Sequence, residues 1–332
     1  MFILLIGFFS VAFGFNLVVL PDTQYATTWW EQIYLQQTAW CCDCADTLDI
    51  QFVMHLGDVV EHRNERPIEW EVAATGLKQL DTCEMPYSVL PGNHDYNQRT
   101  DSYRLYDQYI SLPNADGRYQ DNDRNTYYLV PDGSGGTLLM LSLQYDAAEV
   151  ESWASGVLEQ FSDTPAIIAS HYVTSDCSDR VSRPIRRLME QHCNVLMSVG
   201  GHVFSCGGED VSLVQNNCNV SRPSIVTDYQ HRERGGTGWL RMYSLDSDVL
   251  CAHTFSTLLE RYEKDDTSSF SYSFSESAVQ PGCSTPPVCT SHYTPAGFVL
   301  GIFYVLAIDF TLLALFLGRT EFAGTKSVRF LL

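Results

Sequence analysis

Leu90-Pro91-Gly92-Asn93-His94-Asp95 is the stretch of sequence that decides the fold. Its Pro-Gly pair ends a short apolar run, so Asn93 and His94 follow the carboxyl end of a predicted strand, where open α/β sheets bind ligands. An amide, an imidazole and a carboxylate in a row can supply a metal ligand, a proton donor and a group that orients the donor. Taken alone, the stretch also fits an ordinary turn rich in Asn and Asp. A functional interpretation therefore requires the same arrangement to recur along the chain.

The arrangement recurs at four further apolar runs, each followed by residues that bind metals. The runs cover 15–20, 50–56, 166–169 and 195–199, and they are followed by Asp22 and Gln24, Asp58, His171 and His202. Asp22, Asp58 and Asn93 are 36 and 35 residues apart, which is the length of a strand–helix–strand unit. We therefore expect all three at the same edge of a parallel sheet. Oxygen and imidazole ligands drawn from separate strands are what a two-metal hydrolytic site needs.

The rest of the chain supplies helices, a hairpin and late strands. Predicted helices cover 27–45, 67–83, 147–161 and 182–191; a hairpin covers 126–130 and 137–144; strands that would form a second sheet cover 224–229, 239–245 and 249–255. The polar, Tyr-rich stretch 98–124 is expected to be a long loop or lid beside the site.

The order and spacing of these motifs resemble the calcineurin-like metallophosphoesterases over roughly residues 16–256. The matching motifs are Asp22-Thr23-Gln24, Gly57-Asp58, Gly92-Asn93-His94-Asp95, a lone His171 and Gly201-His202, and residues 229–230 and 235–241 further resemble a branch of the family with Gln in the first motif. The resemblance implies a four-layer α/β/β/α sandwich of two sheets. It also implies a metal-dependent phosphoesterase that cleaves phosphomonoesters or phosphodiesters by attack of a metal-activated hydroxide.

The same resemblance implies two divalent ions, of Mn, Fe or Zn, and a role for each motif residue. Asp58 would bridge the ions; Asn93, His171 and His202 would complete one site, and Asp22 and Gln24 would hold the other. His94 would contact the phosphate and protonate the leaving oxygen, oriented by Asp95.

Two residues depart from the pattern of the family. Gln24 replaces the commoner histidine, and Phe204 stands where the second histidine of G-H-x-H is expected. Since phenylalanine cannot coordinate a metal, the ion at Asp22 and Gln24 is expected to bind weakly. Cys206 is either a substitute ligand or half of a disulfide. The alternative function is a binding protein that keeps the fold with impaired catalysis. Glu61 replaces the tyrosine ligand of purple acid phosphatases, so membership of that subfamily is not expected.

Composition limits the partners and the compartment. The 332 residues include 20 Lys and Arg against 40 Asp and Glu, a formal charge of −20, so nucleic-acid binding is not expected. The eleven cysteines lie between Cys41 and Cys289, which indicates disulfides in an oxidising compartment, with at least one thiol free or paired between chains. A zinc cluster at Cys41, Cys42 and Cys44 is the rival interpretation, but no further ligand follows at finger-like spacing. Asn219 begins an N-glycosylation sequon.

The two ends of the chain are apolar. Residues 1–14 are expected to be a cleaved signal peptide rather than a buried strand, and 15–260 the phosphoesterase domain. Residues 261–294 read as a Ser/Thr/Pro-rich stalk without a core, in which Cys283 and Cys289 close a small loop. Residues 295–318 are predicted to be a transmembrane helix despite Asp309, followed by a basic cytoplasmic tail, 319–332. The expected protein is a single-pass type I membrane protein of the cell surface or an endomembrane, with an extracellular or lumenal active site.

Overall fold

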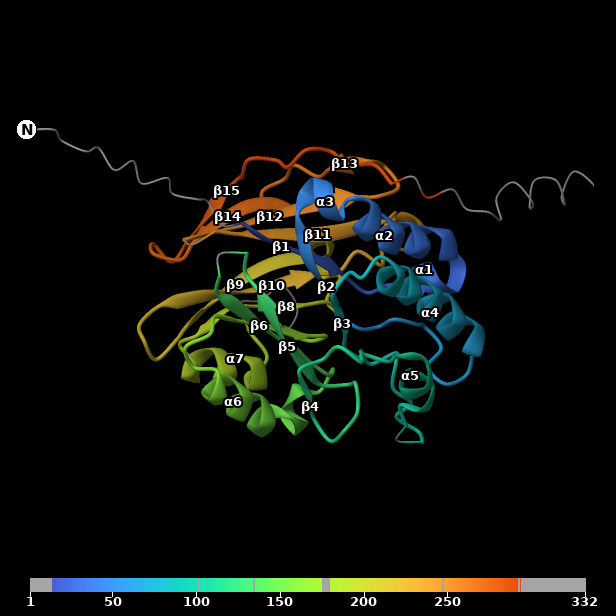
Figure 1. Cartoon of the computed structure of the whole chain (residues 1–332), viewed down its shortest axis with the longest axis horizontal. Coiled ribbons are helices and arrows are strands. Elements are labelled where there is room, and N and C mark those ends of the chain that lie inside the picture. The colour runs from blue at the N-terminus through green and yellow to red at the C-terminus, as the bar shows by residue number, and fades with distance from the viewer. Residues whose placement is uncertain are drawn as a thin grey trace, which may run out of the picture. The chain divides into compact units, whose positions relative to one another are not determined.

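The computed structural model describes residues 14–100, 102–133, 135–174, 180–246, 248–291 and 293. Their architecture is mixed α/β, as predicted, with two sheets and helices outside them (Figure 1). The helices are α1 (Gln24–Trp29), α2 (Glu31–Asp43), α3 (Ala45–Leu48), α4 (Pro67–Thr82), α5 (Arg104–Tyr109), α6 (Glu151–Gln160), α7 (Arg183–Gln191) and α8 (Glu233–Gly236), with 3-10 turns η1 (Ala147–Glu149) and η2 (Ser205–Gly208). The strands are β1 (Phe15–Leu20), β2 (Ile50–His55), β3 (Tyr87–Val89), β4 (Gly117–Arg118), β5 (Thr126–Pro131), β6 (Thr137–Leu143), β7 (Ala166–Ser170), β8 (Val195–Gly200), β9 (Glu209–Gln215), β10 (Ser221–Thr227), β11 (Trp239–Leu245), β12 (Val249–Ser256), β13 (Arg261–Tyr262), β14 (Ser269–Ser273) and β15 (Ala278–Pro281).

The first sheet has the order β15-β14-β12-β11-β1-β2-β3, with β13 paired to β12, and the second has the order β4-β5-β6-β7-β8-β10-β9. Pairing is parallel within β1-β2-β3 and within β6-β7-β8-β10. The prediction that the three late strands form a second sheet of their own is wrong. β11 and β12 extend the first sheet beyond β1, whereas β10 pairs with β8 in the second. The pairing partner depends on the return path of the chain, which the sequence of a strand does not encode.

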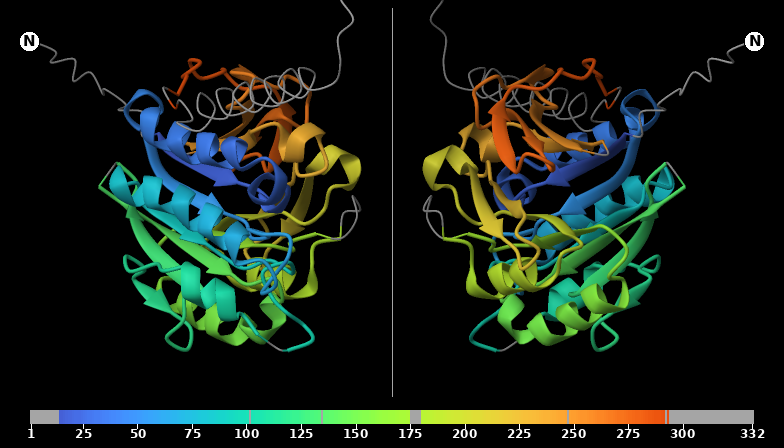
Figure 2. Two further views of the ribbon diagram at one scale, coloured as in Figure 1. Left: turned by 90° about the vertical axis from the view of Figure 1, so that its right-hand side faces the viewer. Right: turned by 90° about the vertical axis from the view of Figure 1, so that its left-hand side faces the viewer.

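Three apolar cores separate the layers of this sandwich. Side chains of a strand alternate between its two faces, so Val18 and Leu20 of β1 pack with α2 and α4, whereas Leu17 and Val19 pack with the second sheet. The outer face of the second sheet is covered by α6 and α7. In Figure 2 these green helices lie at the bottom of both views, far from the blue helix α2. The near-continuous apolar runs of the central strands follow from burial on both faces.

The predicted helices are present, but some of their bounds differ from the prediction. The helix predicted over 27–45 is divided into α1, α2 and α3, because Trp30 leaves the helical region with φ −138° and ψ 44°. Pro67 begins α4, as predicted. The stretch 98–124, predicted to be a long loop or lid, also contains the helix α5 and the short strand β4. Leu105 and Tyr106 of α5 are buried, and the Tyr106 hydroxyl donates to the carbonyl of Val89 at 3.0 Å.

Residues 261–291 are not a stalk, and this prediction is corrected over the described residues. The strands β13, β14 and β15 complete one end of the first sheet. Phe270 and Tyr272 of β14 are buried and alternate with three half-buried serines, a period of two that the Ser-rich composition concealed. The small loop between Cys283 and Cys289 is also wrong. Cys283 is bonded to Cys251 of β12, and Cys289 to Cys44, so both half-cystines attach this segment to the sandwich.

The prediction of disulfides is confirmed. Cys42 is bonded to Cys83, Cys193 to Cys218, and Cys206 is also disulfide-bonded, which removes it as a metal ligand. Because Cys42 and Cys44 both belong to disulfides, a zinc cluster with Cys41 is excluded. Cys41 is the free thiol among the described cysteines, and it is buried.

The predicted signal peptide (apart from Gly14), transmembrane helix and cytoplasmic tail lie outside the described residues. Within the ranges that the structure describes, no helix has both the length and the apolar character that a membrane crossing requires.

Candidate metal centre

The metal-binding residues predicted from sequence lie where the carboxyl ends of the two parallel strand sets meet. Asp22, Asp58 and Asn93 follow β1, β2 and β3, and His171 and His202 follow β7 and β8. Asp58 and His202 adopt left-handed backbone conformations, with φ of 47° and 67°. Such conformations are costly outside glycine and are often found at functional sites. Both turns thus depart sharply from the direction of their strands.

Glycine is required where the β2 and β3 loops approach each other. A Cβ atom at Gly92 would lie 2.2 Å from the Oδ1 atom of Asp58, and one at Gly57 would lie 2.6 Å from the Gly92 nitrogen. These contacts are too close for any larger residue without movement of the backbone. The glycines of the two motifs therefore allow Asp58 and Asn93 to come together.

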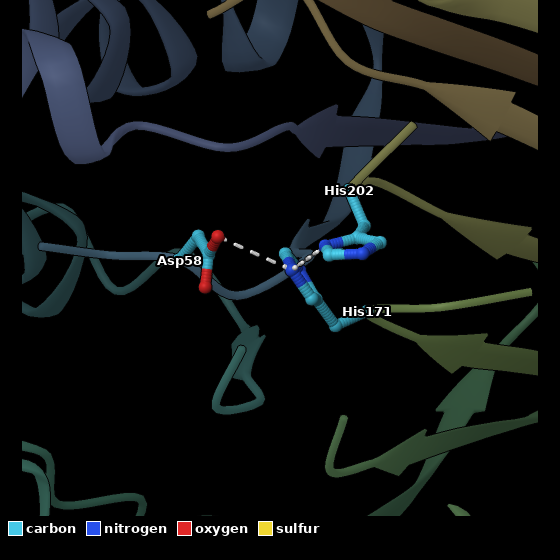
Figure 3. A group of neighbouring side chains, drawn as sticks. All are labelled: Asp58, His171 and His202. Atoms are coloured by element: carbon cyan, nitrogen blue, oxygen red, sulfur yellow. Dashed lines mark hydrogen bonds and ion pairs between the residues drawn. The ribbon is translucent and has the colours of Figure 1, made fainter. Parts of the chain in front are cut away.

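Asp58, His171 and His202 form the centre of the group (Figure 3). The Nε2 atom of His171 lies 3.3 Å from Oδ2 of Asp58 and 3.2 Å from Nδ1 of His202. It also lies 3.1 Å from Oδ1 of Asn93. Candidate ligand atoms of Asp58, His171 and His202 are all within 4.8 Å of one another. The structure therefore brings together these four residues that sequence reasoning proposed as ligands.

The hydrogen bond between His171 and Leu56 fixes the tautomer of the neutral imidazole ring. Its Nδ1 atom is 2.9 Å from the carbonyl oxygen of Leu56, which can only accept, so Nδ1 carries the ring proton. In the neutral ring, the Nε2 atom then carries a lone pair that faces the oxygens of Asp58 and Asn93. Burial lowers the pKa of His171, but the Asp58 carboxylate outweighs burial and raises it. The site thus favours a positive charge between these atoms, and a divalent cation fits it.

Asp22 and Gln24 lie on the other side of Asp58, within a buried amide network. The carboxylate of Asp22 accepts from the backbone N–H of His202 at 3.0 and 3.2 Å. The Nε2 atom of Gln230 donates to Oδ2 of Asp22 and to Oδ2 of Asp228, both at 3.2 Å. The Oε1 atom of Gln230 accepts from Nε2 of Gln24.

This network fixes the orientation of two amides. The amide nitrogen of Gln230 must face the two carboxylates, because ionised carboxylates only accept. Its oxygen must then face Gln24, which presents its own nitrogen. The Oε1 atom of Gln24 is consequently buried with no hydrogen-bond donor among the described residues. A buried amide oxygen without a donor is costly unless a cation binds it, so this side of the centre also fits a metal ion.

Asp228 and Gln230 follow β10, and sequence reasoning assigned neither of them to the site. The available signal was the one used elsewhere, since Asp228 directly follows an apolar strand. Burial, together with the charges of Asp228 and Asp58, raises the pKa of Asp22 well above its ordinary value. Burial also raises the pKa of Asp228. Among the described residues, the ion pairs of Asp22 and Asp58 are with His171 and not with a lysine or arginine, so a bound cation would help to balance the three carboxylates.

His94 lies at the edge of this group, but Asp95 does not orient it as expected. The Nδ1 atom of His94 is 3.1 Å from both the carbonyl oxygen and the Oε2 atom of Glu61. Burial lowers the pKa of His94, but the hydrogen bond with Glu61 and the charge of Asp58 outweigh burial and raise the pKa to about 9. The backbone N–H of His94 also donates to Oδ1 of Asp58 at 2.7 Å. Glu61 thus has the orienting position that sequence reasoning gave to Asp95.

Asp95 binds backbone N–H groups and does not orient His94, which corrects the prediction from sequence. Its carboxylate is fully buried and accepts from the backbone N–H groups of Val59, Val60 and Gly92 at 2.8 to 3.1 Å. It therefore ties the loop after β3 to the loop after β2. The fourth residue of the motif is structural in this protein.

Phe204 lies outside the ligand group. Its side chain is 53% exposed, and its ring centroid is 3.9 Å from that of His231. The position where the family pattern has a metal-binding histidine therefore carries an exposed ring.

The chain is similar to one curated protein and to several solved structures. The chain is 27% identical over 272 residues to the uncharacterized protein YvnB of Bacillus subtilis, an alignment that covers 77% of this chain. The chain spans only about a fifth (21%) of the length of that relative. Similar solved structures include a dimetal phosphatase from Danio rerio, with 14% identity, a TM-score of 0.49 and coverage of 72% of this chain and 95% of that one. GAP50, the anchor in the inner membrane complex of Plasmodium, has 10% identity, a TM-score of 0.49 and coverage of 73% and 84%.

The family comparison is decisive. The sequence profile of the calcineurin-like phosphoesterases matches residues 16–206, which is more than half of the chain and includes every predicted ligand from Asp22 to His202. The chain therefore belongs to the calcineurin-like phosphoesterase family.

Proposed function

We propose that the protein binds two divalent ions at the carboxyl ends of its parallel strands and hydrolyses a phosphomonoester or phosphodiester there. One ion would be held by Asn93, His171 and His202, the other by Asp22 and Gln24, and Asp58 would be shared. The observation that carries the proposal is the convergence of possible ligand atoms from Asp58, Asn93, His171 and His202, together with a buried Oε1 atom of Gln24 that accepts no hydrogen bond among the described residues.

Bound ions would neutralise the phosphate oxygens and lower the pKa of water for in-line attack. The protein has to place its own groups around them. Asp58 is buried and fixed by the backbone N–H of His94, so its second oxygen is held toward His171. His94 is half-buried, and its contacts with Glu61 favour the protonated ring. A protonated His94 can donate to the leaving oxygen, which is the role of a general acid.

The test is hydrolysis by full-length protein that has been stripped of metal and reloaded with Mn²⁺, Fe²⁺ or Zn²⁺. Phosphomonoesters and phosphodiesters are screened in parallel, and bound metal is counted by mass spectrometry. Asp58→Asn is expected to abolish hydrolysis, because it removes a charge shared by both ions. Asp163→Asn, at an exposed aspartate after α6, is the matched control and should retain activity. Metal binding without hydrolysis of any ester would instead favour the impaired binding protein that Phe204 suggests.

The proposed location is a membrane, with the active site on the extracellular or lumenal side. It is supported by the 22-residue apolar segment 297–318, by the basic residues that follow it and by the disulfides of the described domain. Full-length protein should remain with membranes after alkaline carbonate extraction. Release into the supernatant would refute the anchor and leave the proposed chemistry intact.

A further inference from the structure

A connected row of aromatic side chains borders the candidate metal centre. It consists of Tyr25, Trp29, His62, Phe204 and His231, called here the aromatic rim. Members of the rim are sequence neighbours of residues in the centre: Tyr25 follows Gln24, and His231 follows Gln230. The rim therefore begins where the ligand network ends.

The rings contact one another in sequence. Phe204 and His231 have centroids 3.9 Å apart, and His231 and Tyr25 have centroids 5.3 Å apart with planes at 79°. Tyr25 then contacts Trp29 at 5.1 Å, and Trp29 contacts His62 at 6.3 Å. Tilted and edge-on contacts of this kind leave ring faces available to a further ring.

The rim is unusual in its exposure. Trp29 is 55% exposed and Phe204 is 53% exposed, although both are large and apolar. Among the described residues, the exposed tryptophans and phenylalanines are Trp29, Phe204 and, at 44%, Trp30, and the two most exposed belong to the rim. A cluster of exposed apolar side chains next to a polar site usually marks a binding surface. Packing therefore does not account for Trp29, although packing is the commoner role of a tryptophan.

The candidate metal centre and the aromatic rim suit different parts of a substrate. The centre holds buried carboxylates and would take the phosphate through its ions, whereas the rim offers rings. On a chain with a formal charge of −20, the rim is poorly suited to a second anionic group. A planar ring is the ligand that matches exposed faces of Trp and Phe, because stacking needs a flat π surface.

We infer that the aromatic rim binds a planar aromatic group of the substrate, so that the preferred substrates are phosphate esters of alcohols that carry a nucleobase or an aryl ring. This inference rests on the proposed function, since it assigns the part of the substrate beyond the phosphate. It also gives a role to Phe204, which replaces a metal-binding histidine of the family pattern.

The experiment compares matched pairs of esters with full-length, metal-loaded protein. Adenosine 5′-monophosphate is paired with ribose 5-phosphate, and benzyl phosphate with cyclohexylmethyl phosphate. Each pair has alkyl leaving groups and differs in the aromatic ring, so intrinsic reactivity is balanced. The first pair tests a nucleobase and the second tests an aryl ring. The wild type is expected to have a higher kcat/KM for the aromatic member of at least one pair.

The variants are Trp29→Ala and Phe204→Ala, with Trp30→Ala as the matched control. Each rim variant should reduce the kcat/KM ratio between the aromatic and non-aromatic member by about tenfold, the scale of one lost stacking contact. Trp30 is 44% exposed and adjacent in sequence, but it is not part of the row of rings, so its variant should keep the ratio. An equal loss for both members of each pair would show a structural effect and overturn the inference.

Binding is measured separately from turnover with benzylphosphonate and cyclohexylmethylphosphonate, whose P–C bonds are not hydrolysed. Calorimetry should give tighter binding of the aromatic phosphonate by the wild type, and Trp29→Ala should reduce the difference about tenfold. Equal hydrolysis of both members of both pairs refutes the rim and leaves the proposed function standing. Hydrolysis of neither refutes the proposed function, and the phosphonate titration still decides whether the rim binds a ring.

Discussion

The replacement Gln230→Leu tests the amide network with a change of nearly equal size. Gln230 is 4% exposed and makes three side-chain hydrogen bonds, two to the carboxylates of Asp22 and Asp228 and one to Gln24. Leucine can make none of them. The carboxylates lose the donor between them, and the Gln24 amide loses the partner that fixes its orientation.

The expected result is a weaker ion on the Asp22 and Gln24 side. Loss of a group that orients metal ligands typically lowers metal affinity about 10- to 100-fold. That range corresponds to about 1.4 to 2.8 kcal/mol, close to one hydrogen bond to a charged group. Gln230 has no hydrogen bond to Asn93, His171 or His202, so the ion on that side should keep its affinity.

The assay is calorimetric titration of metal-free full-length protein with Mn²⁺, supported by metal counting after dialysis. Gln37→Leu is the matched control, because Gln37 of α2 is also 4% exposed and its amide donates to the carbonyl of Trp239, the first residue of β11. The control should leave both affinities unchanged, although it also deletes a buried amide. Wild-type affinity at both sites in Gln230→Leu, or an equal loss in Gln37→Leu, would refute the proposed network.

Three further predictions concern catalysis and stability. His94→Ala should lower kcat by about 10²–10⁴-fold with metal content unchanged, as for a lost general acid, and unchanged turnover would contradict its role. Glu209→Gln should lower the free energy of unfolding in denaturant by about 3–5 kcal/mol, because it leaves the buried Arg241 without its partner at 2.7 Å. Burial raises the pKa of Glu209, but Arg241 and side-chain hydrogen bonds outweigh burial and lower it. The carboxylate therefore stabilises the fold fully above its unfolded pKa near 4.5, and this stabilisation is lost as the pH falls from there through the lower folded pKa. The loss of stability in acid should be smaller in Glu209→Gln, and equal acid profiles would count against this. The double replacement Cys44→Ser and Cys289→Ser should cost about 2–5 kcal/mol of unfolding free energy, because that disulfide joins residues 245 apart, and an unchanged denaturation midpoint would contradict it.

Much of the fold could be predicted from local sequence because its central strands are buried on both faces. β1, β2, β7 and β8 were recognised as apolar runs that end in polar residues, and the structure has each of them within a residue or two of its predicted bounds. β14 was missed because alternating Ser-Phe-Ser-Tyr-Ser has the composition of a solvated segment but the period of a strand. Strand pairing was also missed where β11 and β12 return to the first sheet, since the choice of neighbour depends on the whole chain.

The candidate site, too, could be predicted only in part from the sequence. The sequence by itself determined the positions that follow the strands, from Asp22 to His202, because a strand end and a ligand-type residue are adjacent in the chain. Only the tertiary structure decided which groups act on those residues. Glu61 rather than Asp95 contacts His94, because the buried Asp95 carboxylate is used by three backbone N–H groups. Gln230 reaches Gln24 across 206 residues of sequence, and a hydrogen bond over such a separation exists only once both sheets are packed and their strand ends face each other.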